Sequence, residues 1–168
     1  LAAETTADSP DMSIEGRRAK LQYSVTDLGA ITTIGINNKG AIVLMRGTDI
    51  YIRRHGGERL VPNACMQKAS TLSDKGVVAG TGSSRPVLYG RGTCIDLGTL
   101  GGTVGDALDV NSKGQAVGSS TLAGDTATHA FLYDDGVMRD LGTLRGVYSS
   151  AAAINKRGMI AGTSDGSA

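Results

Sequence analysis

Short apolar runs alternate along the chain with polar turns that contain glycine, and one such turn occurs four times. Each copy reads Asn or Ser, two polar residues and Gly, with an apolar run on either side. The Asn or Ser side chain can bond the turn backbone, and the glycine can take the positive φ of a type I turn with a G1 bulge. The pattern therefore predicts four antiparallel β-hairpins. The turn residues are Asn37 and Gly40, Ser73 and Gly76, Asn111 and Gly114, and Asn155 and Gly158.

A second recurring element lies between the hairpins. It consists of a strand ending in Tyr, a polar turn and a strand ending in Asp-Leu-Gly, and it is clearest at residues 130–142 and 86–98. A degenerate copy spans residues 49–61, and an isolated second half stands at residues 23–29. The aspartate of this element, which we expect to bond backbone groups at strand ends, recurs as Asp27, Asp96 and Asp140.

Together the two elements give units of about 40 residues with four short strands, the pattern of a β-propeller blade. A single sheet of this size cannot bury both of its faces, and stacking the units buries them. We therefore expect an all-β fold: a small β-propeller of about four blades with four short antiparallel strands each, or alternatively an open β-repeat stack or sandwich. We expect residues 23–29 to complete the sheet begun by the last hairpin. The expected units are residues 21–61, 62–98, 99–144 and 145–168, after a disordered polar lead-in at residues 1–20.

Charge and hydropathy exclude two classes of partner. The 168 residues carry a formal net charge of +1, which gives no electrostatic footprint for nucleic acid. No apolar stretch reaches the roughly 18–20 residues of a membrane helix. We therefore expect no nucleic-acid partner, no membrane insertion and a monomeric protein.

Two cysteines, Cys65 and Cys94, are present. The chain starts at Leu1, which fits either a mature form after signal removal or a shortened chain. An even cysteine count in an exported chain predicts a disulfide between them, and two free thiols are the alternative.

The residue types needed for catalysis are few and scattered. Neither of the two histidines, His55 and His129, lies in a Gly-x-Ser-x-Gly or His-x-x-x-His pattern. Asp106 and Asp109 are close in sequence, as a hard cation would need, but no complete ligand loop surrounds them. We predict no catalytic, cofactor-binding or metal site. The alternative is a hydrolase or lyase of an extracellular polymer that uses Asp106, Asp109 or His129 near a ring axis.

Residues 129–144, which begin His-Ala-Phe-Leu-Tyr and end Asp-Leu-Gly-Thr-Leu, resemble the bacterial HAF repeat together with residues 153–162. That family is named for its His-Ala-Phe motif and is described as an extracellular repeat. The resemblance covers roughly residues 23–163 and is closest in the second half. Residues 85–87 and 48–50 occupy the equivalent position in other units but do not have the His-Ala-Phe sequence. This favours a packing role for the triplet. The resemblance implies export and a propeller-like fold, and it implies no activity.

These observations predict a non-enzymatic exported repeat protein that is secreted, held at the cell surface or periplasmic. We expect a binding or display module that is exposed to the outside of the cell and so to a host immune system. We expect its partner to be a protein or a glycan. The longest polar insertion, residues 119–128, is the expected binding loop because variable loops on one rim of a ring are where partners bind. Its candidate residues are Ser119, Thr121, Asp125 and Thr128.

Overall fold

The computed structural model describes residues 27–55 and 57–166, and these residues form β-strands joined by turns. Apart from one 3₁₀ turn at Ala123–Asp125, they contain no helix, so the all-β prediction is confirmed. None of them forms a helix with the length and apolarity needed to cross a membrane. The lead-in at residues 1–20 and most of the isolated segment at residues 23–29 lie outside the described residues.

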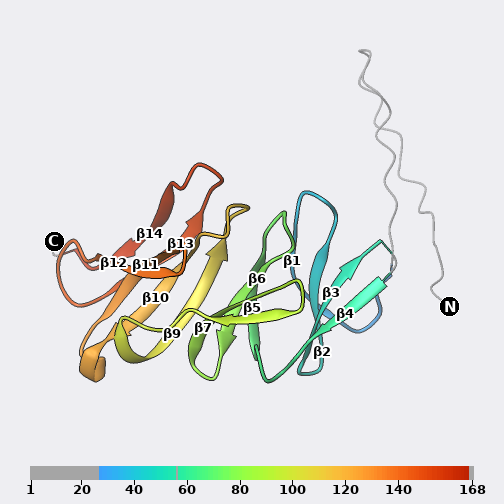
Figure 1. Ribbon diagram of the computed structural model, residues 1–168, viewed down its shortest axis with the longest axis horizontal. Helices are drawn as coiled ribbons and strands as arrows, with labels where there is room; N and C mark the ends of the chain where they lie inside the picture. The colour runs from blue at the N-terminus through green and yellow to red at the C-terminus, as the bar shows by residue number, and fades with distance from the viewer. Residues whose placement is uncertain (1–26, 56, 167–168) are drawn as a thin grey trace, which may run out of the picture. The chain divides into compact units, whose positions relative to one another are not determined.

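The strands form four separate antiparallel sheets, which follow one another in chain order within Thr32–Ala168 and which we call the first to fourth units (Figure 1). The first unit contains β1 (Thr32–Ile36), β2 (Ile42–Arg46), β3 (Asp49–Arg54) and β4 (Gly57–Val61). The second contains β5 (Lys68–Leu72), β6 (Val78–Gly82), β7 (Arg85–Gly90) and β8 (Thr93–Asp96). The third contains β9 (Gly101–Val110), β10 (Ala116–Leu122), β11 (Thr128–Asp134) and β12 (Val137–Gly142). The fourth contains β13 (Ser149–Ile154) and β14 (Ile160–Ser164).

The hairpin between the first two strands has the same register in every unit. The residue before the turn pairs with the residue that opens the second strand, as Ile36 does with Ile42 and Leu72 with Val78. Further along the hairpin of each unit, one residue of the first strand has no partner on the second strand and forms a β-bulge. The bulged residues are Ile34, Ser70, Leu108 and Ala152. The four hairpins are therefore copies of one backbone plan.

The bulge brings the first-strand backbone against the second strand. Gly80, Gly118 and Gly162 stand at one register position there, and a Cβ on any of them would overlap a first-strand backbone oxygen. These positions admit only glycine. The first unit differs, because it carries a fully buried leucine, Leu44, at the same register position.

Three hydrophobic clusters hold the units together, and each lies between consecutive units. Successive residues of a strand point to opposite faces, so one strand serves two clusters. Val78 of β6 joins the cluster with the first unit, whereas Ala79 joins Phe131 in the cluster with the third. Ala116 and Val117 of β10 divide in the same way between the second and fourth units. The second and third sheets are thus buried on both faces.

Cys65 and Cys94 form the predicted disulfide, with their Cα atoms 5.7 Å apart. Cys65 lies in the connection between β4 and β5, and Cys94 lies in β8. The bond therefore ties the outer strand of the second sheet to the segment that enters this sheet.

The expected binding loop is shorter than predicted. Residues 119–122 belong to β10, and Thr128 opens β11, so only residues 123–127 connect the two strands. Ser119 pairs with Ala130, and the Thr121 hydroxyl oxygen accepts a hydrogen bond from the Val104 backbone N–H at 3.1 Å. Cross-strand pairing and hydroxyl hydrogen bonds therefore hold this polar run in the sheet, where its composition alone indicated a loop.

The double substitution Cys65→Ala/Cys94→Ala is expected to lower the free energy of unfolding by about 3–4 kcal/mol, because a closed segment with a sequence separation of 29 residues is released in the unfolded chain. Urea unfolding followed by circular dichroism measures the change. Dithiothreitol should destabilise the wild type to the same extent and leave the variant unaffected. A loss below about 1 kcal/mol, or two reactive thiols in the denatured, unreduced protein, would contradict the prediction.

Candidate functional site

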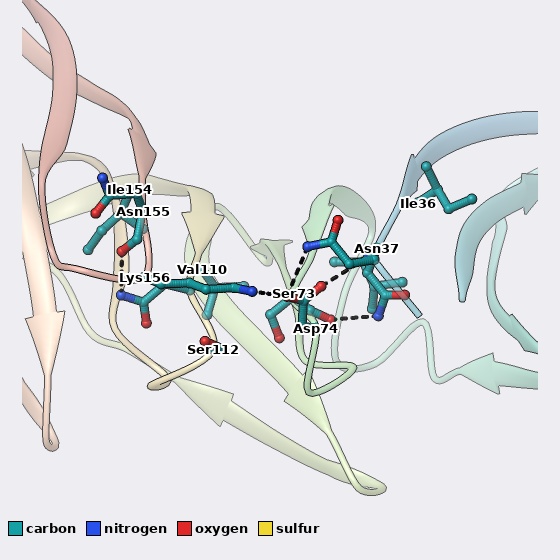
Figure 2. A pocket seen from close by; sticks show the side chains of 12 residues that line it. Ile36, Asn37, Ser73, Asp74, Val110, Ser112, Ile154, Asn155 and Lys156 are labelled. Carbon is teal, nitrogen blue, oxygen red and sulfur yellow. Dashed lines mark hydrogen bonds and ion pairs between the residues drawn. The ribbon is translucent and has the colours of Figure 1, made fainter. Parts of the chain in front are cut away.

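The four repeated turns line one pocket, which we call the turn pocket (Figure 2). Each unit contributes the same three positions: the last residue of its first strand, the Asn or Ser of the turn, and the residue that follows. The turn pocket has a volume of about 300 Å³. The lining residues are Ile36, Asn37, Asn38, Leu72, Ser73, Asp74, Val110, Asn111, Ser112, Ile154, Asn155 and Lys156.

Side-chain hydrogen bonds to the backbone build each turn. The Asn37 Oδ1 atom accepts from the backbone N–H groups two and four positions later, at 3.0 and 2.9 Å. Asn111 and Asn155 make the same pair of bonds, and the shorter Ser73 side chain accepts one bond at 3.1 Å. The closing glycines have φ between +71° and +93°, a range that favours glycine. The local sequence thus sets the direction in which each turn presents its side chains.

Two of these side chains also join neighbouring units. The Asn37 Nδ2 atom donates to the Ser73 carbonyl at 2.9 Å, and the Asn111 Nδ2 atom donates to the Asn155 carbonyl at 3.0 Å. Ser73 has no side-chain amide, so it cannot make the same bond towards the third unit. Both Ser73 and Asn111 are buried, which means that these polar groups need the partners they have.

Asp74 connects three units across the turn pocket. Its carboxylate accepts hydrogen bonds from the backbone and side-chain nitrogens of Asn38 in the first unit, at 3.0 and 3.1 Å. Lys156 of the fourth unit reaches the same carboxylate at 2.9 Å (Figure 2). Lys156 first, and Asn38 second, lower the pKa of Asp74 from 3.8 to about 2. The aspartate is therefore ionised over nearly the whole pH range.

Several polar groups of the turn pocket remain free to bind a ligand. In the part of the chain that the structure describes, the Ser112 hydroxyl and the Asn155 Nδ2 atom have no hydrogen-bond partner, and the Lys156 ammonium retains further donors. Leu72 and Val110 supply buried apolar surface beside them. This combination suits a small polar ligand that carries several hydroxyl groups.

Asp106 and Asp109 are held in separate interactions between units. Asp106 accepts a hydrogen bond from the Thr81 hydroxyl and lies 3.9 Å from the Lys68 ammonium, both in the second unit. The Asp109 Oδ2 atom accepts from the backbone N–H of Ile154 in the fourth unit, at 2.8 Å. Among the described residues, no group of three or more His, Cys, Asp or Glu side chains is placed to hold a metal ion.

The aspartate of Asp-Leu-Gly bonds the backbone, as predicted. In Asp27, Asp96 and Asp140, the Oδ1 atom accepts from the N–H of the following glycine at 2.7–2.8 Å. Asp96 also pairs with Arg85 at 2.9 Å, and Asp140 pairs with the His129 Nδ1 atom at 2.9 Å. Arg85 opens β7, and His129 is the second residue of the equivalent strand β11, so His129 joins two strands as the arginine does.

The four candidate binding residues within residues 119–128 lie outside the turn pocket, and two of them, Thr121 and Asp125, bond to each other. Asp125 accepts from the backbone N–H and the hydroxyl of Thr103, both at 2.8 Å, and from the Thr121 hydroxyl. The Thr121 hydroxyl first, and Thr103 second, lower the pKa of Asp125. Ser119 and Thr128 pair within the sheet. None of the four candidate residues lines the turn pocket.

The turn pocket itself was not predicted from the sequence. The sequence predicts only a structural role for its four turn residues, and it predicts no binding role for the residues that follow them, Asn38, Asp74, Ser112 and Lys156. These four residues occupy the same position of the repeat and are all polar. That shared position is the signal from which a common site could have been inferred.

The substitution Lys156→Gln is expected to raise the pKa of Asp74 from about 2 towards 3.8, because the hydrogen bond from Lys156 is the largest cause of the shift. The folded pKa lies below the unfolded value, so the stabilisation from this pair is complete above pH 3.8 and is lost as the pH falls through about 2. An NMR titration of the Asp74 carboxyl carbon measures the pKa. Arg157→Gln makes the same charge change one residue away and should leave it unaltered. An unchanged pKa in Lys156→Gln would refute the assignment.

Comparison with protein-family models, curated proteins and solved structures finds no match for this chain. The resemblance to the HAF repeat therefore remains a prediction from the residues of the chain.

Proposed function

We propose that this protein is a non-enzymatic, exported binding module whose ligand occupies the turn pocket. The observation that carries the proposal is that the same three positions of all four units line this pocket. Repetition alone needs only one side chain per turn to close the hairpin. The second set of polar residues, which includes Asp74 and Lys156, faces a shared space and supports a binding role.

A glycan is the ligand class that fits this lining best. Amide, hydroxyl, ammonium and carboxylate groups all line the pocket, and a sugar offers hydroxyl groups that both donate and accept. A volume of about 300 Å³ lies in the range of small-molecule sites. A protein partner would need a larger contact surface than the pocket offers.

The proposed location is outside the cytoplasm: secreted, at the cell surface or in the periplasm. The Cys65–Cys94 disulfide supports an oxidising compartment, because such bonds persist there and are rare in the cytosol.

The engaged state of the acidic residues supports a non-enzymatic role. A hydrolase or lyase would require carboxyl groups that converge on one substrate. Asp106 and Asp109 bond to residues of two different units, and His129 pairs with Asp140.

We further propose that the units are blades of a propeller-like ring around the axis of the turn pocket. The convergence of the four turns supports this arrangement. The contacts between described strands link consecutive units, with β5 beside β1 and β9, and β13 beside β9 and β10. Ring closure would additionally bring β13 close to β1.

Ring closure can be tested with pairs of spin labels on the exposed third residue of the turns. In a closed ring, labels at Lys39 and Arg157 belong to adjacent units and should lie closer together than labels at Lys39 and Lys113, which belong to opposite units. Cysteine substitutions at these sites and pulsed electron paramagnetic resonance give both distances. The reverse order of distances would indicate an open row of sheets.

The ligand site can be tested by substituting Ser112 with Tyr, which fills the turn pocket. A glycan array on the wild type identifies the sugar to be used. The variant should bind that sugar at least about tenfold more weakly, because the aromatic ring occupies the site and removes a free hydroxyl. Isothermal titration calorimetry measures the affinity.

Thr126→Tyr, a similar enlargement in the exposed segment between β10 and β11, serves as the control and should bind normally. Binding lost in this variant and kept in Ser112→Tyr would place the ligand at that segment. New reducing ends or unsaturated products during incubation with the bound glycan would overturn the non-enzymatic proposal.

A further inference from the structure

A second cavity, of about 350 Å³, lies between the first and second units, and we call it the basic cleft. The first unit contributes strands β3 and β4 to its walls, and the second unit contributes the β5–β6 turn and the end of β7. No residue of the turn pocket lines it. The lining residues are Ile52, Arg54, Gly57, Glu58, Arg59, Lys75, Gly76, Tyr89 and Arg91.

Four cationic side chains of the basic cleft lack a balancing acid. Arg54, Arg59, Lys75 and Arg91 are all exposed, and none of them forms an ion pair within the described residues. Glu58 is the one carboxylate in the lining. It is already neutralised from outside the cleft, by Arg46 at 2.9 Å and Arg53 at 3.6 Å. The cleft therefore holds about four uncompensated positive charges in a molecule whose formal net charge is only +1.

The structure holds one of these cations by a hydrogen bond and places a second against a turn of the neighbouring unit. The Arg54 Nη2 atom of the first unit donates to the Gly76 carbonyl of the second unit at 3.2 Å. The Arg59 guanidinium lies against Gly92, where an added Cβ would stand 2.5 Å from the Nη2 atom. Glycines at both turns thus let the arginines approach the backbone of the neighbouring unit. Because the Arg54 guanidinium is positioned before any ligand arrives, binding needs less ordering of that side chain.

We propose that the basic cleft binds the anionic groups of an acidic polysaccharide. Guanidinium groups form paired hydrogen bonds with sulfate, phosphate and carboxylate oxygens, and three of the four cations are arginines. Single-stranded nucleic acid is less well matched, because its binding sites offer aromatic faces on which bases stack. The one aromatic residue of the lining, Tyr89, is buried.

This site is independent of the glycan site proposed above. It uses different residues and recognises charge, whereas the turn pocket presents mainly neutral groups around one internal ion pair. The substitution Ser112→Tyr should therefore leave binding at the basic cleft unchanged. Either proposal can fail without affecting the other.

The test measures binding of the full chain to dextran sulfate, with uncharged dextran as the matched polymer. The wild type should bind dextran sulfate and not dextran, and the affinity should fall as salt screens the charges. Arg59→Gln/Arg91→Gln should weaken binding by at least about tenfold, because two charge-assisted contacts are lost. Lys113→Gln/Arg139→Gln removes two exposed charges elsewhere and should change the affinity less than about twofold.

Three results would overturn the proposal. Equal weakening in both double variants, each with an unchanged thermal unfolding midpoint, would show that diffuse surface charge is responsible. Sodium sulfate, added at the concentration of the polymer's own sulfate groups and at constant ionic strength, should not displace the polymer. If it does, the cleft is a site for a free anion. Tighter binding to single-stranded DNA than to dextran sulfate at equal charge would identify a nucleic-acid site.

Discussion

The stacking of two-faced sheets is the constraint on which the rest of this molecule depends. The middle sheets have apolar residues on both faces, as Val78 and Ala79 illustrate in β6, and one sheet cannot bury both of its faces by itself. Each middle sheet therefore requires a neighbour on either side, and the three hydrophobic clusters are the result. Burial of each Val, Leu, Ile or Phe side chain contributes about 1.5–3 kcal/mol, so the clusters and not the individual hairpins supply most of the stability.

The two proposed sites follow from this stacking. Placing copies of one unit beside each other brings equivalent turns together, and the side chains that these turns present then share one space. Asp74 shows the effect, because its partners Asn38 and Lys156 come from two other units. The basic cleft has the same origin in a less symmetric form, since Arg59 reaches a turn of the neighbouring sheet. In both cases the chemistry belongs to an interface between units.

How much the sequence reveals depends on the range of the interaction. The hairpin turns, the disulfide and the bonding of Asp140 to its following glycine were predicted, because each rests on local turn chemistry or on a single possible pairing. The strand at residues 119–122 was missed because its partners, β9 and β11, override its polar composition. The turn pocket and the basic cleft were missed for a related reason. They are assembled from residues such as Arg59 and Arg91 that only the packing of whole sheets brings together.

The glycine position beside the bulge restricts how such repeats can be recombined. In the second, third and fourth units this position touches a backbone oxygen of the partner strand, whereas the first unit accommodates Leu44 there. A genetic exchange that joined β2 to the first strand of another unit would force the leucine into that oxygen. A crossover within a hairpin that brings β2 to another unit is therefore penalised, and a crossover between sheets is not. Shuffling among these repeats should therefore keep β2 together with β1.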